Sequence, residues 1–404
     1  MRVHGAKNST LPLLAACLLC GGECVLHNCP QLSDVGITMQ ILRHLGCQVQ
    51  REGSTVTVDS SQIHNFDIPD EWMREMRSSI VFLGAILART GKAELSFPGG
   101  CELGPRPIDL HLSALKKLGV QIHEDHGRLH CSVRHGLRGK NIGFSFPSVG
   151  ATENVMLATV LAKGTTVITN AACEPEICDL AAFLNACGAR VQGAGSSTIV
   201  IQGVEHLHGC EHHVIPDRIA AATLLSAAAV TGSGILLRGI EPAHLEPVLP
   251  VFEEAGCELI VRGKELAIMP PERLSPLQSV RTMPYPGFPT DAQAPIMAMA
   301  CVAQGTSVFV ENIFESRYKH VGELTRLGAR IKVEGRVAVI EGVGHLSGAS
   351  VQAADLRGGA ALVVAGLAAE GVTQVNHVRY IDRGYEHLEQ TLAQLGANIV
   401  RLDD

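Results

Sequence analysis

The chain has 404 residues, of which 46% are hydrophobic and 18% charged, and its formal net charge is −7. This composition fits one large or two medium folded domains and excludes a disordered chain. The acidic balance disfavours nucleic-acid binding, which usually needs a basic surface. The chain contains thirteen scattered cysteines. Their odd number and irregular spacing predict free thiols in a cytoplasmic protein.

The N-terminal segment looks like a secretory signal, because a basic start precedes an apolar run from Leu11 to Cys20. The same kind of apolar helix recurs five times later in the chain, where no signal peptide can lie. The repeat therefore disfavours a signal. No apolar run reaches the roughly 18 residues of a membrane span, so we predict no membrane insertion.

Four cysteines near the N-terminus, Cys17, Cys20, Cys24 and Cys29, suggest a zinc site at first sight. No second C-x-x-C pair follows them, however, and we expect Cys17 and Cys20 inside the first apolar helix. We therefore predict no metal.

Six apolar helices are predicted, and each begins with a polar or charged cluster. A helix N-terminus presents free backbone N–H groups and the positive end of the helix dipole, so anions bind there readily. We expect the polar heads to converge on a few shared places and the apolar faces to form the core. The helices begin near Gly5, Met76, Ser148, Pro216, Pro289 and Asp355, and their heads carry Lys7, Asn8, Arg77, Arg218, Asp291, Asp355 and Arg357.

Glycines repeat along the chain at intervals of 68 to 73 residues, each where a helix is expected to end. A glycine suits the left-handed position that closes a helix. An alternating stretch follows each one, which predicts two strands around a turn. A repeat of about 70 residues therefore has the order strand, helix, strand, helix, strand, strand. The repeated glycines are Gly46, Gly119, Gly188, Gly256, Gly328 and Gly396.

Six such repeats predict an α/β protein with two pseudo-threefold domains. Gly46 lies only 46 residues from the start, so the first repeat is short by about the strand before its first helix. We interpret this either as a start codon placed too late or as a genuinely short N-terminus.

A loop from Phe97 to His111 places one cysteine, Cys101, among three glycines and three prolines. Such a loop is a mobile connection that leaves the thiol accessible. With Arg106 and Arg77 nearby, the thiolate form of Cys101 would be favoured. We therefore predict that Cys101 is a reactive residue and not merely a surface thiol.

Five arginines stand in glycine-, proline- or cap-rich contexts: Arg77, Arg106, Arg317, Arg357 and Arg383. Arginine suits bidentate contact with phosphate and carboxylate, so together with Lys7 this set predicts an anionic substrate of several charges. Two roles for Asp291 remain open from the sequence, an N-cap carboxylate or a general base. For Asp217, capping is the stronger interpretation.

Six motifs, in register along the whole chain, resemble the UDP-N-acetylglucosamine branch of the enolpyruvyl transferase family. They are Gly5-Ala-Lys-Asn8, Pro98-Gly-Gly-Cys101 with Gly104-Pro-Arg-Pro107, Ser148-Val-Gly-Ala-Thr152, Phe288-Pro-Thr-Asp291, Asp355-Leu-Arg357 and Asp382-Arg-Gly-Tyr385. The resemblance implies two inside-out α/β barrels, each of three βαβαββ repeats, with the active site in the cleft between them. It places the domains at residues 5–214 and 215–404. In the family an N-terminal strand completes the second domain, and here only residues 1–4 remain of that strand.

The reaction implied by this resemblance transfers enolpyruvate from phosphoenolpyruvate to the 3-hydroxyl of UDP-N-acetylglucosamine and releases phosphate. It is the first committed step of peptidoglycan synthesis, and so bears on cell wall biogenesis, cell shape and cell division. By motif match, Lys7, Arg106 and Arg383 would hold phosphoenolpyruvate, Asp291 would take the hydroxyl proton, and Cys101 would act as an acid. The UDP-sugar site would use Asn8, Arg77, Pro107, Ile108, Asp109, Leu110, Ser148, Val149, Gly150, Thr290 and Ile313, completed by Arg317, Asp355 and Arg357.

The same resemblance implies that Cys101 is alkylated by the antibiotic fosfomycin. Two alternative functions stay open from the sequence. One is transfer to shikimate 3-phosphate by the sister enzyme, although the cysteine loop is not a mark of that branch. The other is a non-catalytic paralogue that binds UDP-sugar, which the short N-terminus suggests.

Overall fold

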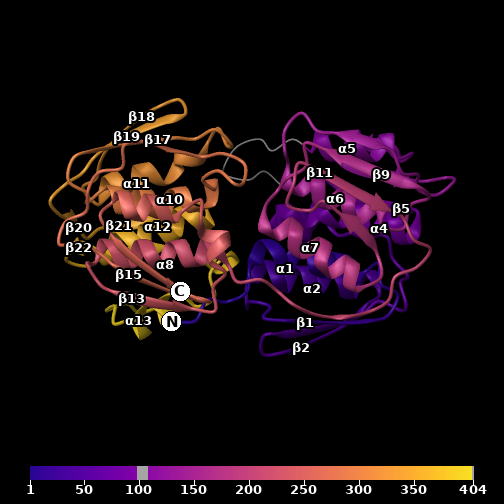
Figure 1. Cartoon of the computed structure of the whole chain (residues 1–404), viewed down its shortest axis with the longest axis horizontal. Helices are drawn as coiled ribbons and strands as arrows, with labels where there is room; N and C mark the ends of the chain where they lie inside the picture. Colours follow the sequence, from indigo (N-terminus) through magenta and orange to yellow (C-terminus); the bar gives the residue numbers. More distant parts are fainter. Residues whose placement is uncertain (98–107, 403–404) are drawn as a thin grey trace. The chain divides into compact units, whose positions relative to one another are not determined.

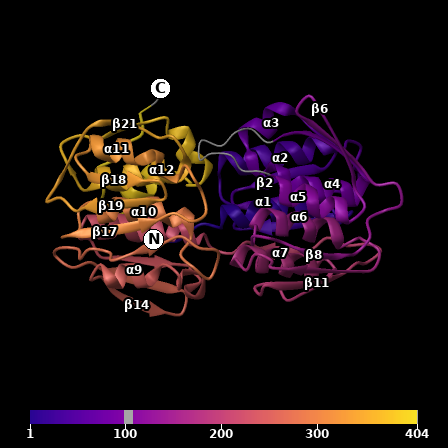
Figure 2. The same cartoon turned by 90° about the horizontal axis from the view of Figure 1, so that it is seen from above.

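The computed structural model describes residues 1–97 and 108–402, and these form two compact units. The N-terminal unit holds the described residues from Gly5 to Ile215, and the C-terminal unit holds Met1–His4 with residues 216 to 402. Figure 1 and Figure 2 colour both units along the sequence. The predicted loop residues Cys101, Arg106 and Pro107 lie outside the described residues.

Three four-stranded sheets of one design build the N-terminal unit. Their strand orders are β12-β1-β3-β2, β4-β5-β7-β6 and β8-β9-β11-β10. In each sheet the first pair is parallel and the other two pairs are antiparallel. The strands are β1 (Glu23–His27), β2 (Gln48–Glu52), β3 (Thr55–Asp59), β4 (Asp67–Ile68), β5 (Lys92–Ser96), β6 (Gln121–Asp125), β7 (Arg128–Ser132), β8 (Asn141–Gly143), β9 (Thr165–Thr169), β10 (Arg190–Gln192), β11 (Thr198–Gln202) and β12 (Glu211–His213).

The helices of this unit include three almost wholly buried ones, α1, α4 and α6, whose apolar residues form the core. Helix α4 packs against both α1 and α6. The helix predicted from Met76 begins instead as the short 3-10 helix η1 (Arg77–Val81) and continues as α4. The helices are α1 (Lys7–Cys17), α2 (Ser33–Leu45), α3 (Asp70–Glu75), α4 (Phe82–Thr90), α5 (Asp109–Lys117), α6 (Val149–Thr159) and α7 (Pro175–Ala186).

The C-terminal unit repeats this design, but only one of its described sheets has four strands. Its sheets are β13-β15-β14, β16-β17-β19-β18, β20-β22 and β21-β23. The strands are β13 (Ile235–Arg238), β14 (Glu258–Arg262), β15 (Glu265–Met269), β16 (Val280–Arg281), β17 (Thr306–Val310), β18 (Arg330–Glu334), β19 (Val337–Glu341), β20 (Leu346–Ser347), β21 (Ser350–Gln352), β22 (Ala369–Glu370) and β23 (Gln374–Asn376).

Three buried helices, α8, α10 and α12, pack on one another at the centre of the C-terminal unit (Figure 1). All three are rich in alanine, and α12 also contains three glycines, and these small residues let the helix backbones approach closely. The helices are α8 (Arg218–Val230), η2 (Pro242–Leu245), α9 (Leu249–Glu254), α10 (Thr290–Ala300), η3 (Arg317–His320), α11 (Val321–Arg326), α12 (Leu356–Leu367), η4 (Val378–Arg383) and α13 (Leu388–Gln394).

The position of the strand expected to be missing is partly filled. Arg2 forms a parallel bridge with Arg238 at the end of β13, where the backbone N–H of Val3 donates to the Arg238 carbonyl at 3.0 Å. The side chain of Val3 is 3% exposed and belongs to the core of the C-terminal unit. In the first repeat, β12 supplies the parallel strand beside β1. Arg2 and Val3 thus cover the edge of β13 at one point.

The repeated glycines all have positive φ, from 91° at Gly256 to 113° at Gly46. This is the left-handed backbone that the sequence predicted at the helix ends. A hairpin follows each of the first five glycines, but the prediction of one after Gly396 is wrong, because residues 397–402 form no strand. Among the described residues, no helix combines the length and apolar character required to cross a bilayer.

Candidate functional site

The head of α10 carries a carboxylate bound by two buried arginines. Arg357 donates to Asp291 Oδ2 from Nε at 3.2 Å and from Nη2 at 3.0 Å, and Arg317 Nη2 donates to Oδ1 at 3.3 Å. The arginine side chains are 1% and 2% exposed, whereas that of Asp291 is 27% exposed. The N-cap of α10 makes no side-chain hydrogen bond. The N-cap residue of α10 is Pro289, and Asp291 stands two residues further on, in the first turn of the helix.

Glu311, at the end of β17, organises the other predicted residues around this head. Its Oε2 accepts from Thr290 Oγ1 at 3.0 Å, and its Oε1 accepts from the backbone N–H groups of Ile313 and Phe314 at 2.8 and 2.9 Å. The Glu311 side chain is almost fully buried. It thus fixes both Thr290 and the loop that contains Ile313, two predicted substrate residues.

The head of α12 joins the same cluster through Arg357. Asp355 caps the helix, since its Oδ1 accepts from the backbone N–H groups of Arg357 and Gly358 at 2.9 and 3.0 Å. The guanidinium of Arg357 lies over the ring of Tyr385 at 5.2 Å, and the Tyr385 hydroxyl hydrogen-bonds Thr223 Oγ1 at 2.9 Å. Arg357 is therefore held from several sides in a fixed orientation.

Arg383 ends η4 close to this cluster. A Cβ added to the next residue, Gly384, would lie 3.3 Å from Nη1 of Arg357. The Arg383 side chain is half-buried. The C-terminal unit thus brings together all of its predicted site residues: Thr290, Asp291, Ile313, Arg317, Asp355, Arg357 and Arg383. At the head of α8, Asp217 accepts from two backbone N–H groups, which confirms its predicted capping role.

In the N-terminal unit, the first residue of α1 is a buried lysine. Lys7 Nζ lies 2.8 Å from Asp34 Oδ2, at the first turn of α2. Asn8 follows and is half-buried. A buried ammonium is stable only beside a carboxylate or strong acceptors, so Asp34 is the reason that a lysine can stand here. Sequence reasoning missed Asp34, which carries no local motif.

The heads of η1, α5 and α6 meet around His111. Asn154 Nδ2 donates to His111 Nδ1 at 2.8 Å, so the neutral ring carries its proton on Nε2. Burial and the nearby Arg77 guanidinium lower the pKa of His111 from 6.5 to about 4. A Cβ at Gly150 would lie 3.1 Å from the ring. Arg77, His111 and Gly150 thus lie close together. Sequence reasoning predicted roles for Arg77 and Gly150 but missed His111.

The remaining predicted residues of this unit stand at helix starts. Ser148 Oγ accepts from the backbone N–H of Ala151 at 3.3 Å and caps α6. Val149 and Gly150 follow it and are half-buried. At the start of α5, Ile108 is buried, Leu110 is half-buried and Asp109 is exposed. Partly exposed positions at helix N-termini are suited to ligand contact, which is what the sequence predicted for them.

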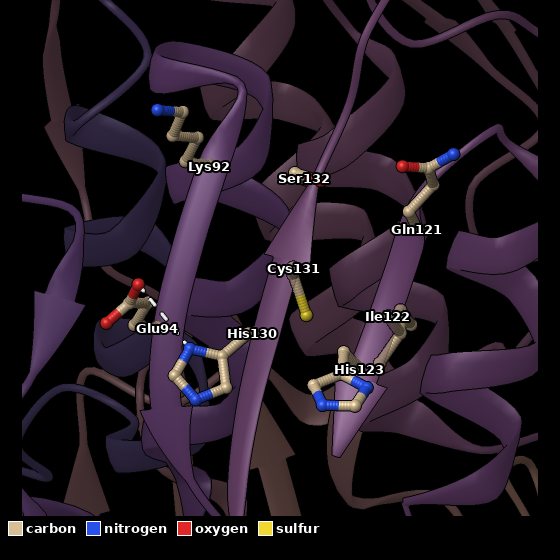
Figure 3. Close-up of a pocket in the computed structure, with 8 residues that line it drawn as sticks. All are labelled: Lys92, Glu94, Gln121, Ile122, His123, His130, Cys131 and Ser132. Carbon is tan, nitrogen blue, oxygen red and sulfur yellow. Dashed lines mark ion pairs between the residues drawn. The ribbon is translucent and has the colours of Figure 1, made fainter. Parts of the chain in front are cut away.

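A surface hollow on the sheet of β5, β7 and β6 is separate from these residues. Figure 3 shows His130, ion-paired with Glu94 at 3.4 Å, beside His123 on the neighbouring strand. None of the predicted site residues that the structure describes lines the hollow. Its lining consists of Lys92, Glu94, Gln121, Ile122, His123, His130, Cys131 and Ser132.

The structure thus has two compact α/β units with mixed sheets. Buried lysine and arginine side chains stand at the starts of several of its helices. The model of the EPSP synthase (3-phosphoshikimate 1-carboxyvinyltransferase) family matches residues 1–392. The chain therefore belongs to this enolpyruvyl transferase family.

Individual relatives that are about half identical to this chain are also named 1-carboxyvinyltransferases, but for UDP-N-acetylglucosamine. UDP-N-acetylglucosamine 1-carboxyvinyltransferase 2 of Caldanaerobacter subterraneus is 53% identical over 403 residues, covering 100% of this chain and 96% of the relative. UDP-N-acetylglucosamine 1-carboxyvinyltransferase 1 of Symbiobacterium thermophilum is 51% identical over 405 residues, covering 99% and 92%.

Solved structures agree at the level of fold. The enolpyruvyl transferase NikO from Streptomyces tendae superposes with a TM-score of 0.90 at 26% identity, covering 99% of this chain and 95% of NikO. EPSP synthase from Acinetobacter baumannii gives 0.77 at 19% identity, covering 100% and 96%. At 19% identity the second likeness concerns the fold alone.

Proposed function

We propose that the chain transfers enolpyruvate from phosphoenolpyruvate to the 3-hydroxyl of UDP-N-acetylglucosamine and releases phosphate. The observation that carries the proposal is the Asp291 carboxylate, held by the buried Arg317 and Arg357 at the head of α10. The names of relatives at 47–53% identity support UDP-N-acetylglucosamine over shikimate 3-phosphate as the acceptor. The reaction would serve peptidoglycan synthesis in the cytoplasm.

The chemistry requires two proton movements. The sugar oxygen loses its proton and adds to C2 of phosphoenolpyruvate while C3 gains a proton, which gives a tetrahedral phospholactoyl ketal. C3 then loses a proton as phosphate leaves, and the enol ether remains on the sugar. Asp291 is the proposed acceptor of the hydroxyl proton and the group that orients the sugar. The two arginines fix both of its oxygens, so the carboxylate is positioned before the substrate arrives.

The other catalytic roles are proposed from the sequence motifs. Lys7, Arg106 and Arg383 hold the phosphate and carboxylate of phosphoenolpyruvate, and Cys101 acts as the acid of its loop. In the N-terminal unit, partly exposed helix starts at Asn8, Arg77, Asp109 and Ser148 offer backbone N–H groups and charge to the UDP-sugar.

We propose two three-repeat domains, at residues 5–214 and 215–404, each an inside-out barrel. Exclusion of water from the bound substrates would protect the ketal intermediate. No metal or organic cofactor enters this mechanism.

The direct test is phosphate release from phosphoenolpyruvate by the purified chain, with UDP-N-acetylglucosamine, with shikimate 3-phosphate, and with neither. The proposal expects release only with UDP-N-acetylglucosamine. Release that depends on shikimate 3-phosphate would favour the sister reaction. Binding of UDP-N-acetylglucosamine without release under saturating phosphoenolpyruvate would favour a non-catalytic paralogue.

The role of the cysteine loop has its own test. Cys101→Asp keeps an acid at the position but removes the thiol. We expect this variant to retain activity and to resist alkylation by fosfomycin. Covalent inactivation of the variant by the epoxide would show that another residue is the target and that the loop assignment is wrong.

A further inference from the structure

Five cysteines gather at one place in the N-terminal unit, away from the helix heads described above. The sulfur atoms of Cys20, Cys24 and Cys187 lie within 4.8 Å of one another. Cys187 Sγ is 3.2 Å from Cys210 Sγ. Cys17 adjoins the group through a contact with Cys24. The sequence offered Cys17, Cys20, Cys24 and Cys29 as one local run, and the objection to zinc was the lack of a second pair.

The fold supplies that second pair from far along the chain. Cys20 stands in the turn after α1, beyond the helix end at Cys17 and not inside the helix as expected. Cys24 points inward from β1. Cys187 follows the last residue of α7, and Cys210 directly precedes β12. Four separate segments thus each contribute one thiol to the cluster, with Cys210 joined to it through Cys187.

We propose that Cys20, Cys24, Cys187 and Cys210 form a tetrahedral site for a thiophilic divalent cation of the zinc class. Four thiolates at about 2.3 Å from Zn²⁺ stand about 3.8 Å from one another in a tetrahedron. The Cys187–Cys210 separation of 3.2 Å is shorter than this, and the sulfurs of Cys20, Cys24 and Cys187 lie within 4.8 Å of one another, so binding requires side-chain rotation, above all of Cys210. The x3 spacing between Cys20 and Cys24 is also within the range of zinc-binding pairs.

Close backbone contacts hold the chain around the cluster in place. A nearby cationic side chain could balance the negative charge of the thiolates. A Cβ on Gly209 would lie 1.7 Å from the Glu23 carbonyl oxygen, so only glycine allows the chain to bring Cys210 beside β1. The backbone N–H of Val25 donates to the Cys210 carbonyl at 2.9 Å. The guanidinium of Arg89 lies beside Gly21 in the same loop, where it offsets part of the negative charge of a tetrathiolate.

The site also has a way in. Cys20, Cys24 and Cys187 are buried, but Cys210 is partly exposed and the loop at residues 21–23 lies at the surface. A bound cation would connect the end of α1, β1, the end of α7 and the lead into β12. Its role would therefore be to stabilise the N-terminal unit, with no part in the enolpyruvyl chemistry.

The experiment uses the full chain, reduced and freed of metal by a chelator under anaerobic conditions, and titrated with Co²⁺ as a spectroscopic stand-in for Zn²⁺. We expect one Co²⁺ per chain with strong thiolate-to-metal charge-transfer absorption and the visible bands of a tetrahedral ion. Zn²⁺ should displace it and raise the thermal midpoint of the unit. A second group that could take metal, His27, Glu211 and His213, has no sulfur and cannot produce this absorption.

Variants assign the ligands. Cys24→Ser and Cys187→Ser should each weaken Co²⁺ binding at least ~100-fold, an effect in the range of lost metal-site contacts. Cys301→Ser is the matched control, since Cys301 is also fully buried but lies in the C-terminal unit. If the buried variants do not fold, the partly exposed Cys210→Ser should still lose the tetrahedral spectrum.

Two results would overturn the site. One is the absence of thiolate charge transfer at saturating Co²⁺ in the folded chain, or its persistence in the cysteine variants. The other is a Cys187–Cys210 disulfide, found by mass spectrometry in protein purified without reductant, combined with no metal uptake after reduction. That pair would then be a redox pair instead of two metal ligands.

Discussion

The polar helix heads of the two units differ in how their charges are balanced, although the sequence makes them look alike. In the C-terminal unit, two buried arginines and Asp291 form a closed network with Glu311 and Tyr385 nearby. In the N-terminal unit, one lysine pairs with Asp34 and the other heads are partly exposed. One repeat design thus yields a closed charge network in one unit and partly exposed helix heads in the other.

The largest expected effect concerns the centre of the closed network. Asp291→Asn keeps the size of the side chain but removes the charge bound by Arg317 and Arg357. We expect kcat to fall by about 10²- to 10⁴-fold, the usual range for a lost general base. Steady-state phosphate release measures this. Glu265→Gln is a matched control, since that carboxylate pairs with Arg238 at the surface. A kcat within threefold of wild type would remove Asp291 from the mechanism.

Lys7 allows a test of the charge balance in the N-terminal unit. Lys7→Met leaves the Asp34 carboxylate buried without its cation. Breaking a buried ion pair in this way costs about 3–5 kcal/mol of unfolding free energy. Denaturant unfolding of Lys7→Met, Asp34→Asn and the double variant forms a double-mutant cycle. The double variant should be more stable than the sum of the single effects predicts, and simple additivity would mean that the two groups do not interact.

Both units hold a buried neutral histidine, which predicts acid sensitivity. Burial lowers the pKa of His320 to about 4, against the opposing effect of Asp355, and His111 falls to the same value. Below pH 6.5 these histidines bind protons in the unfolded chain but stay neutral in the folded chain. Stability should therefore be complete above 6.5 and fall as the pH drops toward 4, by up to about 3 kcal/mol for each residue.

The histidine variants separate this effect from the titration of carboxylates. Unfolding free energies are measured between pH 7 and pH 4 for wild type, His111→Gln and His320→Gln. Each variant should show a shallower decline than wild type over that window. Identical slopes in all three proteins would show that these rings take up protons equally in the folded and the unfolded chain.

The smallest expected effect concerns a helix cap in the N-terminal unit. Ser148→Ala removes the acceptor for the Ala151 backbone N–H. The cost should be about 1 kcal/mol of stability, the usual value for a lost N-cap. If Ser148 also contacts the UDP-sugar, KM for that substrate should rise while kcat changes little. An unchanged KM would limit Ser148 to the capping role.

Local patterns in the sequence were enough to predict the repeat. Glycine closes each helix through its own backbone preference, and alternating residues mark the hairpins after the first five repeated glycines, so both signals lie within a few positions. The short stretch after Gly396 forms no hairpin in the described residues. The heads of the six helices could be found for the same reason. The helix from Met76 was predicted one residue early, and its first turn proved to be a 3-10 turn.

Side-chain partners were not predictable in the same way. Asp291 meets Arg357 across 66 residues, and Lys7 meets Asp34 through the packing of two helices. The pairing of Cys20 and Cys24 with Cys187 depends on how β1 and α7 come together. Such contacts are set by tertiary packing, and no spacing rule within one repeat reports them.

Product identification tests the central claim most directly. The purified chain is incubated with phosphoenolpyruvate and UDP-N-acetylglucosamine, and the nucleotide sugar is analysed by mass spectrometry while phosphate is counted. The account predicts an enolpyruvyl ether on the sugar 3-oxygen, formed in a one-to-one ratio with phosphate and lost in Asp291→Asn. Phosphate release without any modified sugar, or an unchanged yield in Asp291→Asn, would contradict it.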